Sequence, residues 1–545
     1  METITTDVLV IGGGAAGLRA AIAAREAGTD VLLVSKTPVG YANCSAISNA
    51  GIAAAMGLRD PRDNPEAHVR DTIEGGRFIN QRALVEALAE RSPREIGEAQ
   101  RLGIQFRTFE GAMFSSLTPG HSYPRAVSVA EGIGVGMTRP MREFALKIGV
   151  GFREGTLAYQ LFQRDGRAVA ALGVDKDGTP VLLQAKAIVL AGGGAGYAYA
   201  RTNNPVAMTG DGYALAYRAG VSLIDMEFVQ LYPTGLNEPG LPSVNVYYEG
   251  LVLRGGAVLR NSLGEDTLAK HGLLTDKQRT RDAMTRALSL EIAEGRGVQG
   301  GVVMDLGAVS ADDLQRFARA IPKALASDAT TTPKSFHVSP VVHYFMGGVK
   351  VNAQAETDLP GLFAGGEVAG GIHGANRLGG NALAETLVFG AIAGENAAQF
   401  ALREPPITPM ERDVQNGADR IEHVATQQRG ESLNALREEA RGIVWRSAGP
   451  IRTGHDLESG LLELSDMRRR LAGAAVPERA DVVKALEIEN IITTGETIIA
   501  SALERTESRG AHFRLDYPHE DGAWLKNVLI SCVGGAMQAV IQPVP

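Results

Sequence analysis

The sequence is poor in cysteine, in aromatic residues and in long apolar runs. Its 545 residues include two cysteines, Cys44 and Cys532, and only 5% are aromatic. Two cysteines cannot hold an iron–sulfur cluster or a four-cysteine zinc site within the chain, and they exclude a disulfide scaffold. No apolar run reaches the roughly 18 to 20 residues of a membrane helix. We therefore expect no membrane span in this chain.

Basic blocks and a cleavable leader are also missing. The net charge is −8 and the isoelectric point is about 5.8, which argues against nucleic-acid binding. The chain enters the apolar stretch DVLVIGGG with no basic segment before it, so no signal peptide is expected. Together these absences predict a cytoplasmic protein. Any association with a membrane would have to come through a partner protein.

Glycine, in contrast, is abundant, and three glycines form a motif. Gly12, Gly14 and Gly17 make G-x-G-x-x-G between a strand pattern (DVLVIG) and an alanine-rich helix pattern (AAGLRAAIAAREAG), and a second strand pattern (TDVLLVSK) follows. In such a βαβ unit the first glycine allows the turn, the second admits a pyrophosphate, and the third lets the helix pack on the strand. The motif predicts dinucleotide binding. Because the second strand ends in Ser35 and Lys36 rather than an acid, this unit alone leaves FAD and NAD both open.

The remaining patterns indicate an α/β protein with an insertion and a helical end. Helical patterns span about 63–75 and 81–103, and strand patterns recur near 169–175, 181–184, 186–191 and 360–366. Scattered short elements at 236–345 indicate an inserted α+β capping domain. We expect a Rossmann-like nucleotide-binding domain with a parallel sheet in two parts, 1–235 and 346–405. A helical domain at 410–515 and a C-terminal tail at 516–545 complete the expected organisation.

Several long segments occur in the order found in one family of flavoproteins. They include VIGGGAAGLRAAIAA, TGDGYALAYRAG, MEFVQLYPTG, HYFMGGVKVN, HGANRLGGNALAE and RTESRGAHFR. Through these segments the chain resembles, nearly end to end, the flavoprotein subunits of succinate dehydrogenase and fumarate reductase and the related L-aspartate oxidases. The resemblance implies FAD in the Rossmann-like domain, a small carboxylic-acid substrate, and hydride exchange between flavin N5 and a C–C bond next to the carboxylate. A separate iron–sulfur electron-transfer subunit is a further partner that it implies.

The resemblance also assigns the contacts to FAD. They are Gly12, Gly14, Gly17, Ser35, Lys36, Ser45, Gly51, Asp211, Glu367, Ala382 and Leu383. The family has a serine where this chain has Ala382, so one flavin contact is expected to be missing. Cys44 occupies the position at which succinate dehydrogenases link the flavin to a histidine. A thioether is chemically open, but the expected state is a small buried thiol beside non-covalent FAD.

Arg377 lies in HGANRLGGN, a stretch with three glycines in nine residues. A guanidinium is permanently charged and matches a carboxylate bidentately, and a bare backbone leaves room for a ligand. From the residues alone, pairing of Arg377 with an internal acid such as Glu367 or Glu385 is an equal alternative. The resemblance implies that Arg377 binds the substrate carboxylate and that His343, in HYFMGG, shares it.

The resemblance gives Arg281, in TRDAMTRA, the role of proton transfer. Because the pKa of arginine is above about 12, this role needs a dry site and a relay that restores the proton. Glu249, in YYEGLVLRGG, matches the glutamate of the family's relay. The second relay arginine is replaced by Val252, and Arg254 is either its substitute or a plain surface residue.

The second carboxylate clamp of the family is altered. Tyr232 stands in place of its histidine and Tyr248 in place of its threonine, although a few extra residues lie between them. A phenol donates a neutral hydrogen bond, whereas a histidinium adds charge. Either a dicarboxylate binds more weakly, or the far end of the substrate is an amide, an aromatic ring or an amino-bearing carbon. Thr118 replaces the amine-binding glutamate of aspartate oxidases, which disfavours aspartate oxidation unless Glu110 or Glu131 approaches.

Formation or reduction of a C=C bond next to a carboxylate is the function that these residues favour. Three alternatives stay open. The chain could be a flavin oxidase resembling L-aspartate oxidase, or a flavoprotein subunit whose main task is docking an iron–sulfur partner. It could also be a homologue that keeps FAD structurally after losing its second clamp and relay.

Overall fold

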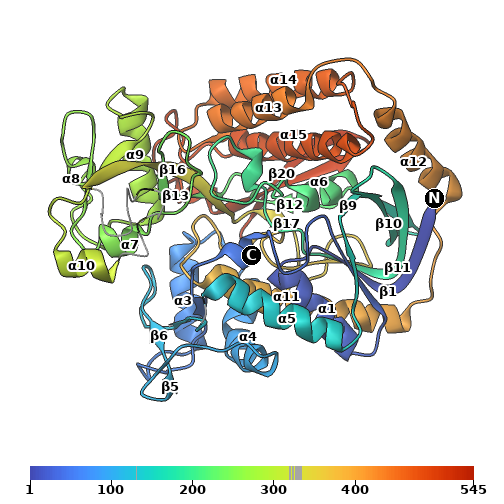
Figure 1. The fold of residues 1–545 in the computed structure, drawn as a ribbon, viewed down its shortest axis with the longest axis horizontal. Helices are drawn as coiled ribbons and strands as arrows, with labels where there is room; N and C mark the ends of the chain where they lie inside the picture. The colour runs from blue at the N-terminus through green and yellow to red at the C-terminus, as the bar shows by residue number, and fades with distance from the viewer. Residues whose placement is uncertain (131, 318–320, 322–324, 326–333) are drawn as a thin grey trace.

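The main sheet is built on the βαβ unit that the glycine motif predicts. The computed structural model describes residues 1–130, 132–317, 321, 325 and 334–545 (Figure 1). Strand β1 (Glu2–Ile11) leads through the glycine turn into α1 (Ala15–Glu26) and then into β2 (Val31–Ser35). β1 and β2 are parallel, and the last four residues of β1 are buried, as in a strand covered on both faces. The predicted unit is confirmed.

The main sheet has seven strands, of which five are parallel. Their order is β8-β2-β1-β11-β10-β9, with β18 beside β11. The bounds are β8 (Gly151–Glu154), β9 (Thr156–Arg164), β10 (Arg167–Asp175), β11 (Pro180–Leu190) and β18 (Leu362–Ala364). The strands predicted at 181–184 and 186–191 are one strand, β11. The sheet is mixed rather than wholly parallel, because short turns make β10 antiparallel to both of its neighbours, β9 and β11.

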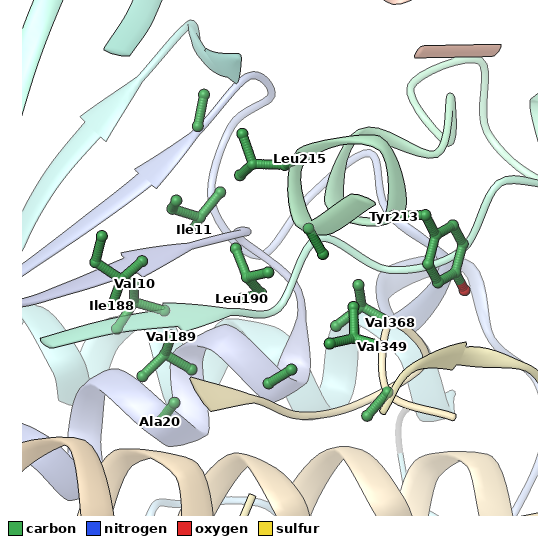
Figure 2. Close-up of a cluster of buried hydrophobic side chains, with 14 of the residues drawn as sticks. Val10, Ile11, Ala20, Ile188, Val189, Leu190, Tyr213, Leu215, Val349 and Val368 are labelled. Atoms are coloured by element: carbon green, nitrogen blue, oxygen red, sulfur yellow. The ribbon is translucent and has the colours of Figure 1, made fainter. Parts of the chain in front are cut away.

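Two long helices pack closely beside this sheet. α11 (Asn381–Arg403) contacts α1, and a Cβ added to its Gly394 would lie 2.2 Å from the carbonyl oxygen of Ala20. Figure 2 shows the core at this place, to which Val10 of β1, Val189 of β11 and Ala20 of α1 contribute.

The predicted helices at 63–75 and 81–103 are α3 (Pro65–Gly75) and α4 (Arg82–Arg101). The other elements of this part are α2 (Cys44–Ile47), β3 (Ile52–Ala53), β4 (Thr108–Phe109), β5 (Ala112–Met113), β6 (Ser115–Ser116), β7 (Ala126–Val127) and α5 (Ile133–Lys147).

A second sheet forms a lobe with its own apolar core, at the left of Figure 1. Its strands lie in the antiparallel order β13-β16-β15-β14. They are β13 (Val229–Leu236), β14 (Val258–Arg260), β15 (Val302–Asp305) and β16 (Ser335–Phe345). Its helices are α7 (Tyr248–Leu251), α8 (Thr267–Lys270), α9 (Arg281–Ala293) and α10 (Ala311–Arg316). The predicted start of the insertion, residue 236, is the last residue of β13, so the lobe's sheet begins earlier than the sequence pattern suggested.

The charged, periodic stretch near the end of the chain is helical, as predicted. It forms α12 (Glu411–Ala425), α13 (Leu433–Ala448), α14 (Gly454–Leu471) and α15 (Asp481–Glu504). Helix α15 is buried along most of its length and contacts α13, α14 and the short helix α6 (Asp211–Arg218). Through α15 and α6, the helical region packs directly on the nucleotide-binding part.

Residues 516–545, expected as a tail, contain a hairpin that belongs to the fold. Strands β19 (Lys526–Val533) and β20 (Ala536–Pro543) pair with each other, and β19 pairs with β12 (Leu223–Ile224), which also pairs with β17 (Gly348–Val349). Asp225 fixes this junction: its carboxylate accepts hydrogen bonds from the backbone N–H of Val528 (2.9 Å) and from the side chain of Asn527 (2.6 Å). The hairpin is therefore anchored next to the strand that leads into the lobe.

Candidate active site

The glycine turn before α1 leaves no space for side chains. Gly12 has φ 126°, and a Cβ there would lie 2.1 Å from the carbonyl oxygen of Ala191. A Cβ on Gly17 would lie 1.9 Å from the carbonyl oxygen of Gly12. Gly14 is the N-cap of α1 and provides no side-chain cap, so N–H groups of the first turn beyond that of Ala15 remain available to a phosphate. The turn therefore fits the pyrophosphate of a dinucleotide.

Lys36, which follows β2, is fixed by two acids. Its Nζ lies 2.7 Å from Asp211 at the start of α6 and 2.7 Å from Glu487 of α15. Burial would lower the pKa of Lys36, but these two carboxylates outweigh it and raise the pKa above its ordinary value. Ser35 is buried beside the glycine turn, where a Cβ on Gly13 would lie 2.7 Å from its Oγ. The residues predicted at the end of β2 thus border the turn, and Glu487 is a neighbour that no motif indicated.

The other residues assigned to FAD lie around the N-termini of α1 and α11. Ser45 accepts a hydrogen bond from the N–H of Ala15 (3.3 Å). Gly51 is tightly packed, because a Cβ there would lie 3.0 Å from the Cβ of Ala126. Ala382 and Leu383 belong to the first turn of α11, whose N-cap Gly380 has φ 90°. Glycine and small residues therefore gather at two helix N-termini, the kind of surroundings that the phosphates of a dinucleotide require.

Two of the ionisable groups in this region, Glu367 and Cys44, influence each other. Burial raises the pKa of Glu367 to about 7, although the backbone N–H of Phe345 donates to its carboxylate at 3.1 Å. Burial, assisted by Glu367, raises the pKa of the Cys44 thiol well above its ordinary value. Cys44 is half-buried at the start of α2. Its sulfur is therefore held as a protonated thiol, a poor nucleophile toward a flavin.

Arg377 is buried without an acidic partner. It lies in the loop before α11 and is 5% exposed, and its Nε has no hydrogen-bond partner. Its guanidinium carbon lies 4.3 Å from the centre of the Tyr344 ring. Within the described residues no carboxylate lies within ion-pair distance of it. Burial, followed by repulsion from Arg281, lowers the pKa of Arg377 to about 10.

The two acids that could have neutralised Arg377 are engaged elsewhere. Glu385 accepts hydrogen bonds from the Tyr344 hydroxyl and lies 2.6 Å from Nε2 of His373. Glu367 is bonded to the backbone of Phe345. The interpretation of Arg377 as one half of an internal ion pair is therefore not supported. Its charge is left for a ligand.

Arg281 is held by the neighbouring strand and helix. It is the first residue of α9, and its guanidinium donates to Oε1 of Gln230 (3.2 Å) and to Oε1 of Glu249 (3.3 Å). Burial lowers the pKa of Arg281, but Glu249 and the tyrosines around it more than offset this effect and raise the pKa above its ordinary value. Gln230 also donates to the backbone oxygen of Arg377 (2.9 Å) and so links the two arginines.

His343 lies between the two arginines and a pair of amides. Its Nδ1 is 3.2 Å from the side-chain nitrogen of Asn203, which is also hydrogen-bonded to Asn245. Burial, together with Arg377 and Arg281, lowers the pKa of His343 well below its ordinary value. The imidazole is therefore neutral at physiological pH and can offer a ligand one hydrogen bond without charge.

Tyr232 packs against both Tyr248 and His343. The two tyrosines are buried, and their ring centroids lie 5.5 Å apart in an edge-to-face arrangement. The hydroxyl of Tyr232 donates to Oε2 of Glu249 at 2.7 Å, and the Arg281 guanidinium carbon lies 5.4 Å from the centre of its ring. Burial and Glu249 raise the pKa of Tyr232 well above its ordinary value. Tyr232 is thus a firm hydrogen-bond donor to Glu249.

The family's relay is interrupted where the sequence predicted. Val252 is 4% exposed and lies in the lobe's apolar core, while Arg254 is exposed and has no hydrogen bond to Glu249. Arg254 therefore does not restore the relay, and the carboxylate of Glu249 instead receives the hydroxyl of Tyr232. Thr118 donates to the backbone oxygen of Gly379 (3.2 Å), and Glu110 is exposed in the β4–β5 turn. Glu131 lies outside the described residues.

Three residues of this site were not indicated by the sequence reasoning. Gln230 links Arg281 to the loop of Arg377, Asn203 contacts His343, and the ring of Tyr344 lies under Arg377. Two of them stand inside segments that carried the family resemblance, FVQLYPTG and HYFMGG, so their closeness in sequence to Tyr232 and His343 is a signal for them. Asn203 is different, because only the fold brings it next to His343.

The fold and this site define an FAD-dependent oxidoreductase, and comparisons with known proteins agree. Residues 7–383 match the family described as FAD binding domain, and residues 437–544 match the one described as fumarate reductase flavoprotein C-term. The chain is 34% identical to one of the subunits of the CoM/CoB fumarate reductase of Methanothermobacter marburgensis, with 97% of this chain and 98% of that one covered. It is 31% identical to the L-aspartate oxidase of a Nostoc species, with 96% and 93% covered.

A solved structure agrees over the whole chain. Sdh1 of Mycobacterium smegmatis, determined in complex with UQ1, superposes with a TM-score of 0.90 at 33% identity, covering 100% of this chain and 95% of that chain. The chain belongs to the family of fumarate reductase and succinate dehydrogenase flavoproteins, and it is an FAD-dependent oxidoreductase of the type that acts on CH–CH bonds. The predicted fold class and cofactor are confirmed. Among the described residues, no helix combines the length and the apolar character needed to cross a membrane.

Proposed function

We propose that the chain interconverts a C=C and a C–C bond next to a carboxylate that Arg377 and His343 hold. Bound FAD would supply the hydride chemistry at its N5 atom. Arg377 would bind the carboxylate as a bidentate cation, and His343 would donate one neutral hydrogen bond. Both groups would stabilise the negative charge that builds up next to the carboxylate during the reaction, which is electrostatic catalysis by donors fixed in advance.

The observation that carries this proposal is the unpaired charge of Arg377. A buried cation without a partner is unfavourable in a folded protein, because it loses its hydration without gaining an opposite charge. Groups of this kind are concentrated at functional sites, where a ligand supplies the missing interaction. Here the two nearby acids are bonded to other residues, and the Tyr344 ring supports the guanidinium from one side only.

We assign proton transfer to Arg281. Its guanidinium is hydrogen-bonded to Glu249, which is the arrangement needed to take a proton back after one has been given to a substrate carbon. Tyr232 would act as a positioning residue, because its hydroxyl holds the second oxygen of the same carboxylate. Gln230 bonds to both Arg281 and the loop of Arg377, so it would fix the distance between the carboxylate grip and the proton donor.

An external electron carrier would complete the cycle. The chain has only two cysteines, Cys44 and Cys532, too few for an iron–sulfur cluster of its own. We therefore propose that the partner is a separate iron–sulfur protein, in keeping with the designation of relatives as flavoprotein subunits. The cytoplasmic location predicted from the sequence stays a prediction alongside this proposal.

The test is anaerobic reoxidation of the reduced holoenzyme. Unsaturated carboxylic acids, including fumarate, should restore the absorbance of the oxidised flavin, and the Arg377→Met variant should lose this reaction while retaining its flavin. If no unsaturated acid reoxidises the flavin, but an amino acid reduces the oxidised flavin and oxygen then reoxidises it rapidly, the oxidase alternative is correct. If the Arg377→Met variant reacts as fast as the parent protein, the proposed grip is wrong.

A further inference from the structure

We propose that the substrate is a mono-anion: an α,β-unsaturated monocarboxylate, or its saturated counterpart, whose far end is uncharged and packs against the rings of Tyr232 and Tyr248. This inference rests on the proposed function, because it takes the carboxylate at Arg377 as given. It names the chemical class of the molecule that the other half of the site accepts.

The first argument is the balance of charge. Of the two arginines in the site, Arg281 is 3.3 Å from the carboxylate of Glu249, and Arg377 has no ion-pair partner among the described residues. His343 does not add a charge, because burial and both arginines lower its pKa well below its ordinary value. One positive charge is therefore left over for the ligand. A mono-anion neutralises it, whereas a dianion leaves one carboxylate without a partner.

The second argument is that neither tyrosine supplies a positive charge to a second carboxylate. The hydroxyl hydrogen of Tyr232 is committed to Glu249 at 2.7 Å, so toward a ligand this side chain presents only its ring and an oxygen lone pair. Tyr248 turns its ring edge-to-face toward Tyr232, with the centroids 5.5 Å apart. Ring surfaces bind apolar or aromatic groups and repel a carboxylate placed over their faces.

The third argument is the absence of another cation on this side. In the described part of the chain, Arg281 is the one lysine or arginine within hydrogen-bonding or cation–π distance of Tyr232, Tyr248 or Glu249. The far carboxylate of a dicarboxylate would also approach the negative charge of Glu249. Beyond His343 lie neutral amides, Asn203 and Asn245. Hydrogen-bonding capacity is present there, but no positive charge.

Fumarate and its methyl esters provide a matched test, because they share one carbon skeleton and differ mainly in charge. With the reduced holoenzyme under anaerobic conditions, we expect kcat/KM for monomethyl fumarate to exceed that for fumarate by at least about tenfold. Dimethyl fumarate, which has no carboxylate, should not react. Cinnamate, a monocarboxylate with an aromatic far end, should react faster than fumarate.

Binding to the oxidised holoenzyme gives a readout without turnover, because an oxidised flavin has no electrons to give to these unsaturated acids. The change in flavin absorbance on titration should give a Kd for monomethyl fumarate at least about tenfold below that for fumarate.

The variant Tyr232→His places an ionisable base beside Glu249. It should shift the ratio of kcat/KM values and the ratio of Kd values toward fumarate by about tenfold or more. Tyr248→His is a second variant in case the first does not fold. Tyr517→His, at an exposed tyrosine of the C-terminal region, is the matched control and should leave both ratios unchanged.

The outcomes separate the two proposals. A fumarate preference equal to or greater than the monoester preference, in both rate and binding, overturns the mono-anion inference and leaves the proposed function intact. Equal reaction of dimethyl fumarate contradicts the carboxylate grip itself. Reoxidation by none of these compounds overturns the proposed function.

Discussion

The two arginines of the site differ in their surroundings more than in their position. Arg377 comes from a glycine-rich loop of the FAD-binding part and faces no acid, whereas Arg281 comes from the lobe and is paired with Glu249. Burial lowers the pKa of Arg377 to about 10, while Glu249 outweighs burial and raises the pKa of Arg281. In the function that we propose, the unpaired arginine binds an anion and the paired one exchanges a proton. The same residue type would then serve two functions because its partners differ.

The largest effect is expected when the paired arginine is removed. Arg281→Gln should lower kcat by roughly 10²- to 10⁴-fold, because the proton donor is lost. It should also lower the free energy of unfolding by roughly 1–3 kcal/mol, since the buried carboxylate of Glu249 loses a charged partner. Single-turnover rates and urea denaturation measure the two effects. An active variant of unchanged stability would show that this half of the site has been misassigned.

The unpaired arginine should separate activity from stability. Arg377→Met should lower kcat/KM by about 10²- to 10³-fold, because the fixed donor to the carboxylate is lost. Unlike the change at Arg281, it should not destabilise the protein, and a gain of about 0.5–2 kcal/mol is expected from removing an unpaired buried charge. Thermal unfolding of the two variants side by side provides the comparison. A loss of stability at both positions would mean that Arg377 has an internal partner.

Glu367 offers a pH-dependent test of the same contrast. Burial raises its pKa to about 7 in the folded chain, so the folded state holds this proton more tightly than the unfolded state does. The flavin-free protein should therefore lose stability as the pH rises from about 4.5 to 7, by on the order of 3 kcal/mol at most, and this contribution should be constant outside that window. Urea denaturation at several pH values measures it. Glu367→Gln should flatten this part of the profile, and an unchanged profile would show that another group titrates there.

The smallest effect is expected at Cys44. Because burial and Glu367 keep its thiol protonated, acid precipitation of the holoenzyme should release all of the flavin into the supernatant. Cys44→Ala should bind FAD to the same extent. Flavin that remains with the precipitated parent protein, but not with the variant, would demonstrate a thioether.

The glycine turn and its βαβ unit could be predicted from the sequence, because their causes are local. Gly17 is required by its contact with the carbonyl oxygen of Gly12, and Gly12 has the positive φ of the turn itself. A strand-to-helix pattern identifies this unit. The roles that we propose for Arg377 and Arg281 also rest on short ordered segments. In these cases a segment of a few residues contains both the functional side chain and the neighbours that identify its surroundings.

What could not be predicted depends on residues far apart in the chain. Lys36 pairs with Glu487 of α15, and Asn203 reaches His343, although no local pattern connects either pair. The sequence suggested that Tyr232 stands at the second substrate clamp. In the structure its hydroxyl donates to Glu249, so we propose that it positions this carboxylate instead. Sequence patterns indicate which side chains are present, but only the folded chain determines which of them are already engaged.

The β19–β20 hairpin has a consequence for how the molecule is made. Strand β12 leads directly toward Gln230 and Tyr232, yet one of its two neighbours, β19, is translated only after the lobe and all four C-terminal helices. Domains that emerge early from the ribosome can fold before the rest of the chain is synthesised. Here the pairing of β12 with β19 cannot form early, because the partners of Asp225, Asn527 and Val528, are synthesised near the end of the chain. A nascent chain arrested before β19 would keep its glycine turn but would leave β12 paired with β17 alone.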